Sequence, residues 1–288
     1  MTEPERTRYE FEDGVMAAWR WPNPGAPILV FAHANGFNGG VYRQLLQPLS
    51  DRFEIIAPDL RGHGRTSLPA DPTTHTSWDI YANDLLALYD RLNRRPALLA
   101  GHSMGASSTL LAAARLPDAP PLALVEPVVL PSSFYLMARS PIWRFMKGST
   151  IRLGATARKR SNGWPDRDAV ISRYQSRPTF ARWSDGVLED YLEDGLVELE
   201  DGVKLSCDPN WEAANFEGQG HDLLKAARRL GDSVQVLKAQ KGSTVINTAG
   251  LAARGVRIET VEGGHLIPME APDRVASWLG QVADAIGL

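Results

Sequence analysis

A serine within the pattern Gly-x-Ser-x-Gly is the most informative feature of this sequence. Residues 101–105 read Gly-His-Ser-Met-Gly, an apolar run at 96–100 leads into them, and a helix-forming run at 106–115 follows. A strand, a sharp turn and a helix are the context in which this pattern forms a nucleophile elbow. Glycine fits beside the serine because a Cβ there would collide with the neighbouring strand or helix. We therefore predict Ser103 as a nucleophile held above a sheet, at the positive end of the next helix.

A serine hydroxyl needs a base, and His265 is the best placed of the six histidines. It follows two glycines, directly after the last predicted strand at 256–259. A histidine on a loop at the carboxyl end of a strand can meet a serine at the same edge of a parallel sheet. We predict His265 as the general base. The side chain of His102 should point away from Ser103, and we predict a structural role for it.

The third member of such a triad is a carboxylate that orients the histidine. It usually follows the strand two after the elbow, here 234–237, but no Asp or Glu occurs in residues 234–258. Glu126 instead ends the apolar strand predicted at 122–126, where a charge needs a reason to be present. We assign the acid to Glu126, with Asp208 as the alternative. A simple ion pair with a nearby arginine would also explain Glu126.

Two backbone N–H groups should hold the oxyanion of the reaction. One belongs to Met104, the residue after the nucleophile. The second should come from residues 33–37, His-Ala-Asn-Gly-Phe, which follow an apolar strand at 28–32. The glycine allows close backbone approach, and we assign the second donor to Asn35. His33 should order this loop by hydrogen bonds.

The remaining motifs indicate no cofactor chemistry. Residues 59–67 form a glycine-punctuated loop without G-x-G-x-x-G, and no Walker lysine is found. We expect Asp59 and Arg61 to hold loops in place there and to have no catalytic role. No histidine pair has metal-ligand spacing and no cysteine cluster exists, so we predict neither a metal nor a cofactor.

Composition restricts the partners and the location. The chain has 288 residues, a net charge of −3 and one cysteine, Cys207, which we expect to be a buried or idle thiol. A net charge of −3 does not indicate a basic surface that would bind nucleic acid. We see neither an apolar N-terminal signal nor a run of about 18 apolar residues. We therefore expect a soluble cytoplasmic protein that acts on a small molecule.

Apolar runs alternate with helix-like stretches, which predicts an α/β fold with a mostly parallel, twisted sheet flanked by helices. A hairpin at 7–21 should lie at its edge, because Asp13-Gly14 is a turn signal. The other expected strands are 28–32, 54–58, 96–100, 122–126, 234–237 and 256–259. The expected helices are 40–50, 77–91, 106–115 and 271–286, with one more between the last two strands.

Residues 131–230 interrupt this alternation and are too long for a loop. They look helical and are rich in aromatic residues, which such an insert needs to bury for its own stability. We predict a core of residues 1–130 and 231–288 with a helical cap at 131–230 whose inner face shapes an apolar pocket. The expected pocket residues are Phe37, Trp143, Trp183 and Leu266.

The ordered motifs at 33–36, 59–64, 101–105 and 263–265 resemble those of the α/β-hydrolase superfamily. The resemblance covers nearly the whole chain, and the insert resembles the cap domain of that superfamily. It implies the α/β-hydrolase fold and a capped serine hydrolase, similar to esterases and lipases. The motifs are specific for the fold and much less specific for the substrate.

Two positions depart from the usual pattern. Ala34 stands where the superfamily usually has glycine. Glu126 matches the acid position of a subset of haloalkane dehalogenases, and Asn35 resembles the asparagine that follows His-Gly in those enzymes. Those enzymes and epoxide hydrolases use an aspartate nucleophile, whereas Ser103 suits acyl transfer.

We therefore expect a serine hydrolase that cleaves a carboxylic ester of a small-to-medium apolar substrate through an acyl-enzyme. Lactone hydrolysis, C–C bond hydrolysis of a diketone and perhydrolysis remain alternatives on the same triad. Outside this chemistry, the alternatives are a hydrolase-fold protein that binds a ligand without turnover and a cofactor-free oxygenase.

Overall fold

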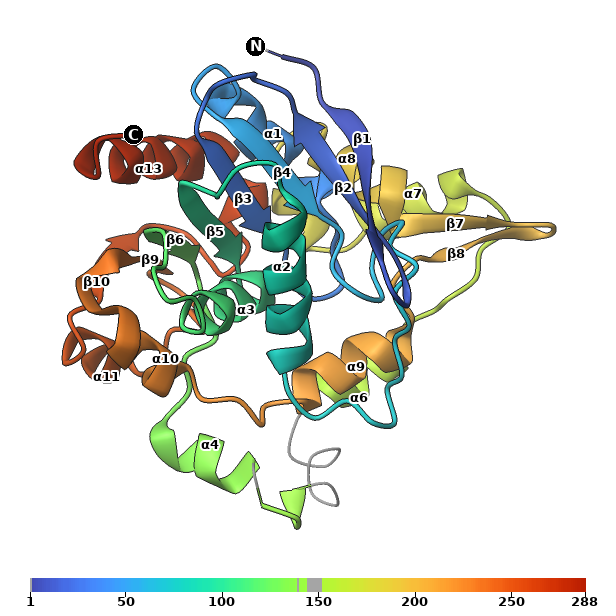
Figure 1. Cartoon of the computed structure of the whole chain (residues 1–288). Coiled ribbons are helices and arrows are strands. Elements are labelled where there is room, and N and C mark those ends of the chain that lie inside the picture. Colours follow the sequence, from blue (N-terminus) through green and yellow to red (C-terminus); the bar gives the residue numbers. More distant parts are fainter. Residues whose placement is uncertain (1, 139, 144–151) are drawn as a thin grey trace.

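An eight-stranded, mostly parallel sheet forms the centre of the molecule in the computed structural model (Figure 1). The structure describes residues 2–138, 140–143 and 152–288. The strand order is β1-β2-β4-β3-β5-β6-β9-β10, with β1, β2 and β4 paired antiparallel and the other neighbours parallel. The strands are β1 (Glu5–Phe11), β2 (Gly14–Trp21), β3 (Ile28–Ala32), β4 (Glu54–Pro58), β5 (Leu98–His102), β6 (Leu122–Val125), β9 (Val234–Ala239) and β10 (Arg257–Val261).

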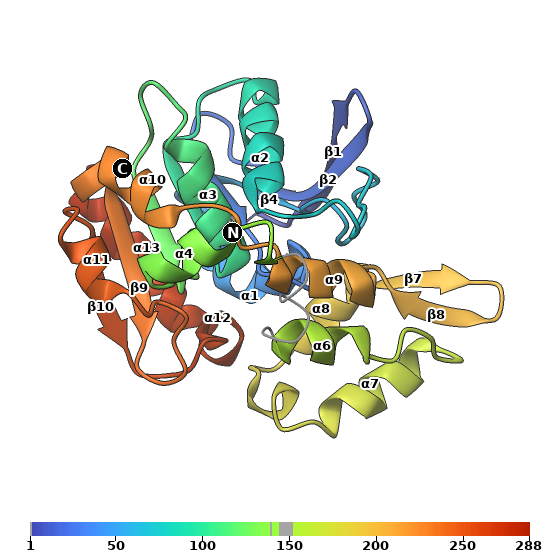
Figure 2. The same cartoon turned by 90° about the horizontal axis from the view of Figure 1, so that it is seen from below.

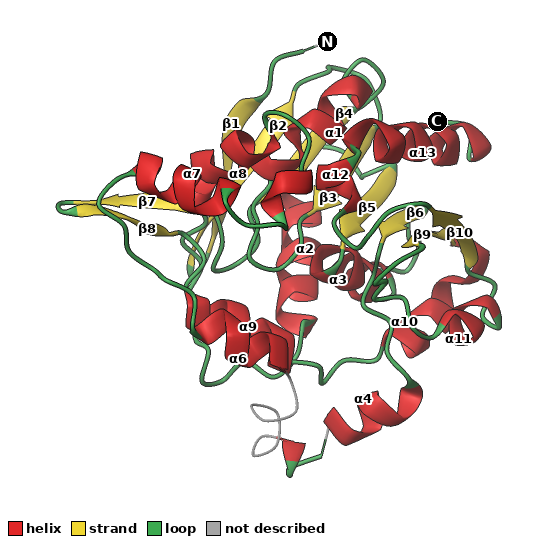
Figure 3. Cartoon of the chain, turned by 180° about the vertical axis from the view of Figure 1, so that it is seen from behind, coloured by secondary structure: helices red, strands yellow, loops and turns green. Residues whose placement is uncertain are grey.

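The central strands are buried on both faces, which explains their continuous apolar runs. In β3, Ile28 and Val30 join the core on one face, and Leu29 and Phe31 join the core on the other. Helices α2, α3, α10 and α11 contribute to the first core, and α1, α12 and α13 to the second (Figures 1 and 3). Their bounds are α1 (Arg43–Leu46), α2 (Asp79–Arg91), α3 (Met104–Ala113), α10 (Leu223–Leu230), α11 (Thr248–Ala252), α12 (Ile267–Glu270) and α13 (Pro272–Ala285). This arrangement confirms the predicted fold class.

The helix expected at residues 40–50 is broken into three short turns. Two 3₁₀ turns, Gly40–Tyr42 and Gln47–Leu49, flank the single-turn α1. Pro48 stands at the start of the second 3₁₀ turn, where its missing N–H and fixed φ end the α-helical hydrogen-bond pattern. Residues 40–49 are therefore helical, as expected, but in three short turns of two kinds.

The segment between β6 and β9 projects from the carboxyl edge of the sheet (Figure 2). It contains a two-stranded hairpin besides its helices, in contrast to the purely helical insert expected. The turn signal Glu200-Asp201-Gly202 connects the two strands, and Gly202 has a φ of +136°. The elements are α4 (Ser132–Ala138), α6 (Arg152–Arg158), α7 (Arg167–Gln175), α8 (Val187–Gly195), β7 (Leu196–Leu199), β8 (Gly202–Leu205) and α9 (Pro209–Glu217).

Helix α10 packs on the sheet, although it falls within the segment expected to be the insert. Leu223 and Leu224 join the same core as helix α3, against which α10 lies. The layer of helices that flanks the sheet therefore resumes at about residue 223, one helix earlier than the expected boundary at 231.

The close approach of α3 to β3 generates a stability prediction. A Cβ on Gly105 would lie 2.2 Å from the carbonyl oxygen of Ala32, whereas a Cβ on Gly280, within α13, meets nothing within 4 Å. Gly105→Ala should lower the free energy of unfolding by about 1–3 kcal/mol. Gly280→Ala should raise it by about 0.5–1 kcal/mol, because alanine loses less backbone entropy in a helix. Urea unfolding followed by tryptophan fluorescence measures both, and equal midpoints for the two variants would contradict this packing.

Candidate active site

Ser103 occupies a strained turn between β5 and α3. Its backbone has φ 54° and ψ −115°, a left-handed conformation that L-residues rarely adopt. Its N–H donates to the carbonyl of Val125 on the neighbouring strand. Glycine is required at position 101 because a Cβ there would lie 2.8 Å from backbone atoms of Ala32 and Ala106. The turn holds the serine hydroxyl above the sheet at the N-terminus of α3.

His265 reaches this hydroxyl from the loop after β10. Its Nε2 lies 3.0 Å from Oγ of Ser103. Gly263, with a φ of +139°, lets the chain turn back over the sheet edge before α12 begins. The His265 side chain is 27% exposed, so one side of the ring faces an open space.

Glu126 stands directly after β6, and its side chain is completely buried. Its Oε2 lies 2.9 Å from Nδ1 of His265. Like Ser103, it has a positive φ, here 51°, and these are the two non-glycine residues with positive φ in the part of the chain that the structure describes. The structure therefore brings Ser103, His265 and Glu126 into one hydrogen-bonded line.

The loop after β9 supplies donors to the Glu126 carboxylate. Oε1 accepts from the N–H of Ala239 and the hydroxyl of Ser243, both at 2.6 Å, and Oε2 accepts from the N–H of Thr244 at 3.0 Å. Burial raises the pKa of Glu126, but the hydrogen bonds from His265, Ser243 and Ala239 outweigh it, and the pKa lies below its ordinary value. The carboxylate is therefore held in its charged form.

Sequence reasoning missed the roles of Ser243 and Thr244. The acid usually stands in this loop, and here, where the sequence has none, the loop provides hydroxyl and N–H donors to Glu126 at the end of the adjacent strand. The sequence signal for these donors is the pair of hydroxyl residues that follows Gly242. The alternative acid, Asp208, does not approach His265, because it is exposed and its side chain caps α9 through the N–H of Asn210.

The loop after β3 carries one N–H without a partner between two that are occupied. The N–H of Ala34 donates to the Tyr42 hydroxyl at 3.0 Å, and that of Gly36 donates to Nε2 of His63 at 3.1 Å. Within the described ranges, no acceptor takes the N–H of Asn35 or that of Met104. These are the two groups predicted to hold an oxyanion.

His33 and His63 order this loop as neutral bases. His33 donates from Nδ1 to the carbonyl of Ala34 and accepts the N–H of Leu60 at Nε2. Burial lowers the pKa of both imidazoles, to about 4 for His63 and well below its ordinary value for His33. Asp59, expected to pin loops, accepts backbone N–H groups on both of its oxygens.

His102 links the loop of Asn35 to the loop of His265. Its Nε2 lies 2.9 Å from the carbonyl oxygen of His265, which can only accept, so Nε2 carries the proton. Its Nδ1 then accepts from the Tyr42 hydroxyl at 2.8 Å, and that hydroxyl accepts the N–H of Ala34. Burial lowers the pKa of His102 to about 3, which keeps this chain of hydrogen bonds intact near neutral pH.

A cavity of 690 Å³ opens beside Ser103 and His265. This volume is typical of a small-molecule site. Its wall is mainly apolar and comes from the loops above the sheet, α4 and α9. Among the residues that form it are Phe37, Trp78, Leu130, Phe134, Phe216 and Leu266. Two of the four expected pocket residues, Phe37 and Leu266, therefore line the cavity.

Trp143 and Trp183, the other two, stand one layer behind the wall. Trp143 packs edge-on against Phe134 at 5.3 Å between ring centroids. Trp183 packs in the same way against Phe37 at 5.7 Å. Both are buried, so they support the lining rings from behind.

The cavity wall carries almost no charge. No lysine or arginine of the described segments lines it, and Glu212 is the one carboxylate there. Glu212 pairs with Arg160 at 2.5 Å. The same segments contain no group of three His, Cys, Asp or Glu side chains suited to a metal, and no helix in them is long and apolar enough to cross a membrane.

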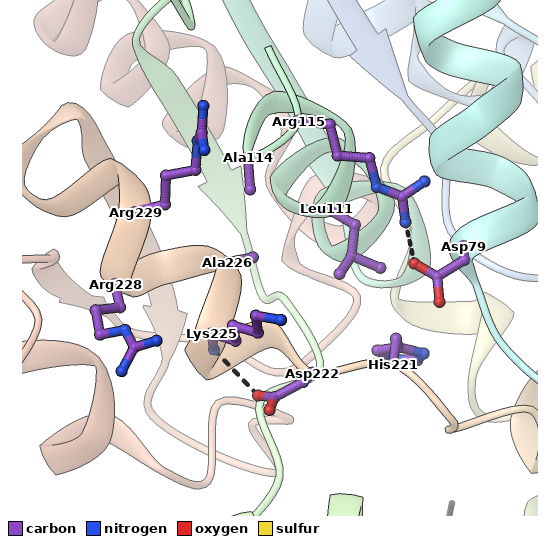
Figure 4. A pocket seen from close by; sticks show the side chains of 10 residues that line it. All are labelled: Asp79, Leu111, Ala114, Arg115, His221, Asp222, Lys225, Ala226, Arg228 and Arg229. Carbon is purple, nitrogen blue, oxygen red and sulfur yellow. Dashed lines mark hydrogen bonds and ion pairs between the residues drawn. The ribbon is translucent and has the colours of Figure 1, made fainter. Parts of the chain in front are cut away.

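A second hollow of 490 Å³ lies on the surface between α10 and α3 (Figure 4). Charged side chains such as Arg115, Lys225 and Arg228 surround it. The stacked rings of Trp78 and His221, with centroids 4.7 Å apart, lie between this hollow and the cavity of Ser103. The reactive groups therefore face the larger apolar cavity alone.

Comparison with known proteins identifies the family. The sequence profile of the α/β-hydrolase family matches residues 29–278. The chain belongs to this family, which confirms the resemblance and the fold expected from the motifs.

Individual relatives agree with this assignment. The 2-(acetamidomethylene)succinate hydrolase of Mesorhizobium japonicum is 42% identical over 227 residues, which make up 78% of this chain and 74% of that protein. The crystal structure of an E-2-(acetamidomethylene)succinate hydrolase has a TM-score of 0.78 at 24% identity and covers 98% of this chain and 100% of its own. A thioesterase domain from the curacin biosynthetic pathway has a TM-score of 0.77 at 19% identity, covering 97% and 100%.

The buried histidines generate a prediction for the pH dependence of stability. His33, His63 and His102 stay unprotonated when folded, whereas each takes up a proton on unfolding below about pH 6.5. Asp59 acts in the opposite direction, because burial and then Asp194 raise its pKa to about 7. The unfolded state thus binds about two more protons, and stability falls as the pH falls.

Between pH 6.5 and 5.5 we expect a loss of about 2 kcal/mol in the free energy of unfolding. Urea unfolding at several pH values measures it. His102→Gln removes one of these histidines and should reduce the loss over this range by about 1 kcal/mol. A stability that stays constant over this range would contradict the neutral, buried state of the three rings.

Proposed function

We propose that this protein is a serine hydrolase that cleaves a carboxylic ester of a small-to-medium apolar substrate. One observation carries the proposal: the hydrogen-bonded line from Ser103 through His265 to Glu126 opens on an apolar cavity of 690 Å³. This is the arrangement of nucleophile, base and orienting acid that acyl transfer uses.

In the first step, Nε2 of His265 takes the proton of Ser103 while Oγ attacks the ester carbonyl carbon. The negative charge moves to the carbonyl oxygen. The free N–H groups of Asn35 and Met104 donate hydrogen bonds to this oxygen and stabilise its charge. Glu126 remains ionised and stabilises the imidazolium that forms. Its lowered pKa supports this role.

The tetrahedral intermediate then collapses. His265 gives its proton to the leaving alcohol oxygen as the C–O bond breaks, which leaves the acyl group on Ser103. A water molecule, deprotonated by His265, attacks the acyl-enzyme, and Oγ leaves with the returning proton. The products are a carboxylic acid and an alcohol.

The segment from residue 131 to α10 acts in this proposal as a cap. Phe134 of α4 and Phe216 of α9 both line the cavity, opposite the sheet edge that carries Ser103. Trp143 contributes indirectly, by packing behind Phe134. The cap therefore sets the shape of the acyl or alcohol pocket, while the sheet edge carries the chemistry.

A second candidate is the reaction named for the relative at 42% identity, hydrolysis of 2-(acetamidomethylene)succinate. A succinate carries two carboxylates, which proteins usually bind with arginine or lysine. The described wall of the cavity offers neither, and its one charged side chain is Glu212. Lactones and C–C substrates would use the same triad.

The first test is hydrolysis of p-nitrophenyl esters from acetate to a long acyl chain, with Ser103→Ala as the control. We expect turnover that peaks at a short or medium chain, because a cavity of 690 Å³ accommodates only a limited acyl length, and that vanishes in Ser103→Ala. Hydrolysis of 2-(acetamidomethylene)succinate, measured in parallel, tests the second candidate. A folded wild-type protein that cleaves no ester above the Ser103→Ala background would overturn the proposal.

The acid is tested by Glu126→Gln. The imidazolium would lose its counter-charge, and we expect kcat to fall about 10⁴-fold while the protein stays folded. Asp208→Asn is the matched control, since asparagine also caps helices well, and it should keep the wild-type rate. Equal rates for Glu126→Gln and the wild type would show that another group orients His265.

A further inference from the structure

One wall of the cavity is formed by α9 and the residues just after it. Glu212, Phe216 and Gln219 all line the cavity. The spacing of four residues places Glu212 and Phe216 on one side of α9, and Gln219 follows just after the end of the helix. Phe216 separates two polar side chains on this wall.

The side chain of Glu212 is only 10% exposed, and its two carboxylate oxygens have different surroundings. Oε2 receives the guanidinium of Arg160 at 2.5 Å. Oε1 receives no hydrogen bond from any described residue, and a Cβ on Gly36 would lie 3.0 Å from it. This oxygen therefore lies against the loop of Asn35, beside the proposed oxyanion site, as an acceptor without a donor.

Gln219 repeats this pattern at the other end of the wall. It is 4% exposed, and its Nε2 donates to the carbonyls of Asn215 and Phe216 at 3.4 and 3.3 Å. Its Oε1 is buried and has no partner in the described chain. Buried acceptors without donors are uncommon, because each loses its hydrogen bonds to water.

Both atoms are acceptors, but Oε1 of Gln219 is fully buried, so Oε1 of Glu212 is the acceptor that a ligand in the cavity reaches, and it specifies the ligand chemistry. A carboxylate or phosphate would meet the charge of Glu212, while a group with an O–H or N–H would complete the missing hydrogen bond. Arg160 balances the charge of Glu212, so a neutral donor suffices.

We propose that Glu212, assisted by Gln219, is a specificity-determining residue that binds a hydrogen-bond donor of the substrate. The substrate is thus an apolar ester that carries a hydroxyl or amide N–H group. This inference rests on the proposed hydrolase function and deepens it.

Glu212→Gln is the informative variant. Because Arg160 only donates, the amide oxygen of the new side chain will pair with it, and the NH₂ group will replace the free acceptor. A donor then faces the cavity where an acceptor stood. Glu217→Gln is the matched control, since Glu217 is a buried carboxylate of the same helix, pairs with Arg158 and does not line the cavity.

The experiment compares hydroxyl and ketone esters, because a ketone accepts but does not donate. Ethyl 3-hydroxybutanoate and ethyl 3-oxobutanoate place the group on the acyl side. 2-Hydroxypropyl acetate and 2-oxopropyl acetate place it on the alcohol side. A pH-stat measures kcat/KM for each, and the change in the hydroxyl-to-ketone ratio on mutation cancels the intrinsic reactivity of the esters.

For at least one of the two ester pairs we expect the hydroxyl-to-ketone ratio of kcat/KM to fall about 10–100-fold in Glu212→Gln. The ratio should stay constant in Glu217→Gln. Gln219→Leu should lower the ratio less. A ratio that is unchanged in Glu212→Gln for both pairs, or that falls equally in Glu217→Gln, overturns the proposal.

A binding measurement separates this proposal from the hydrolase function. Calorimetry with Ser103→Ala and the same esters reports affinity without turnover. Tighter binding of the hydroxyl ester that is lost in Ser103→Ala/Glu212→Gln supports the acceptor site even if the wild type hydrolyses none of them. Equal affinity for hydroxyl and ketone esters in both backgrounds refutes it.

Discussion

The hydrogen bond between the buried carboxylate of Glu126 and the ring of His265 is the interaction on which the site depends. A carboxylate with no exposed surface is stable only if donors replace the water it has lost. Here the replacement comes from the ring and from the loop that contains Ser243 and Thr244. Those donors meet Glu126 only because β6 and β9 are adjacent and parallel. The order of the strands therefore determines which groups stabilise the charge of Glu126.

Backbone strain is concentrated at the same edge of the sheet. Ser103 and Glu126 end the neighbouring strands β5 and β6, and both have a left-handed backbone. Such conformations persist where the surrounding structure over-determines them. The N–H of Ser103 is held by Val125 and that of Glu126 by Leu237, so the ladder of the sheet continues through both strained residues. The sheet thereby aims two reactive side chains at one point above its edge.

Much of this was predictable from local sequence, because each feature has a local cause. The buried strands appear as apolar runs, the elbow needs its glycines, and the lack of an acid after β9 pointed to Glu126. Features that depend on distant packing were not predictable. Trp143 and Trp183 belong to the aromatic insert, but which rings reach the cavity depends on their packing behind Phe134 and Phe37, which the sequence does not encode locally. The donors at Ser243 and Thr244 are ordinary loop residues until β9 pairs with β6.

The position of the acid also affects how the chain completes its fold during synthesis. Leu122 of β6 pairs with Val234 of β9, 112 residues later. A ribosome needs roughly 5–20 s to add that many residues. Throughout this time Ser103 and Glu126 have already been made, but one edge of β6 is open and the Glu126 charge lacks its donors. The half-built sheet thus exposes an unpaired strand. The charge at its end acts against premature pairing with other chains until about the last fifth of the polypeptide is made.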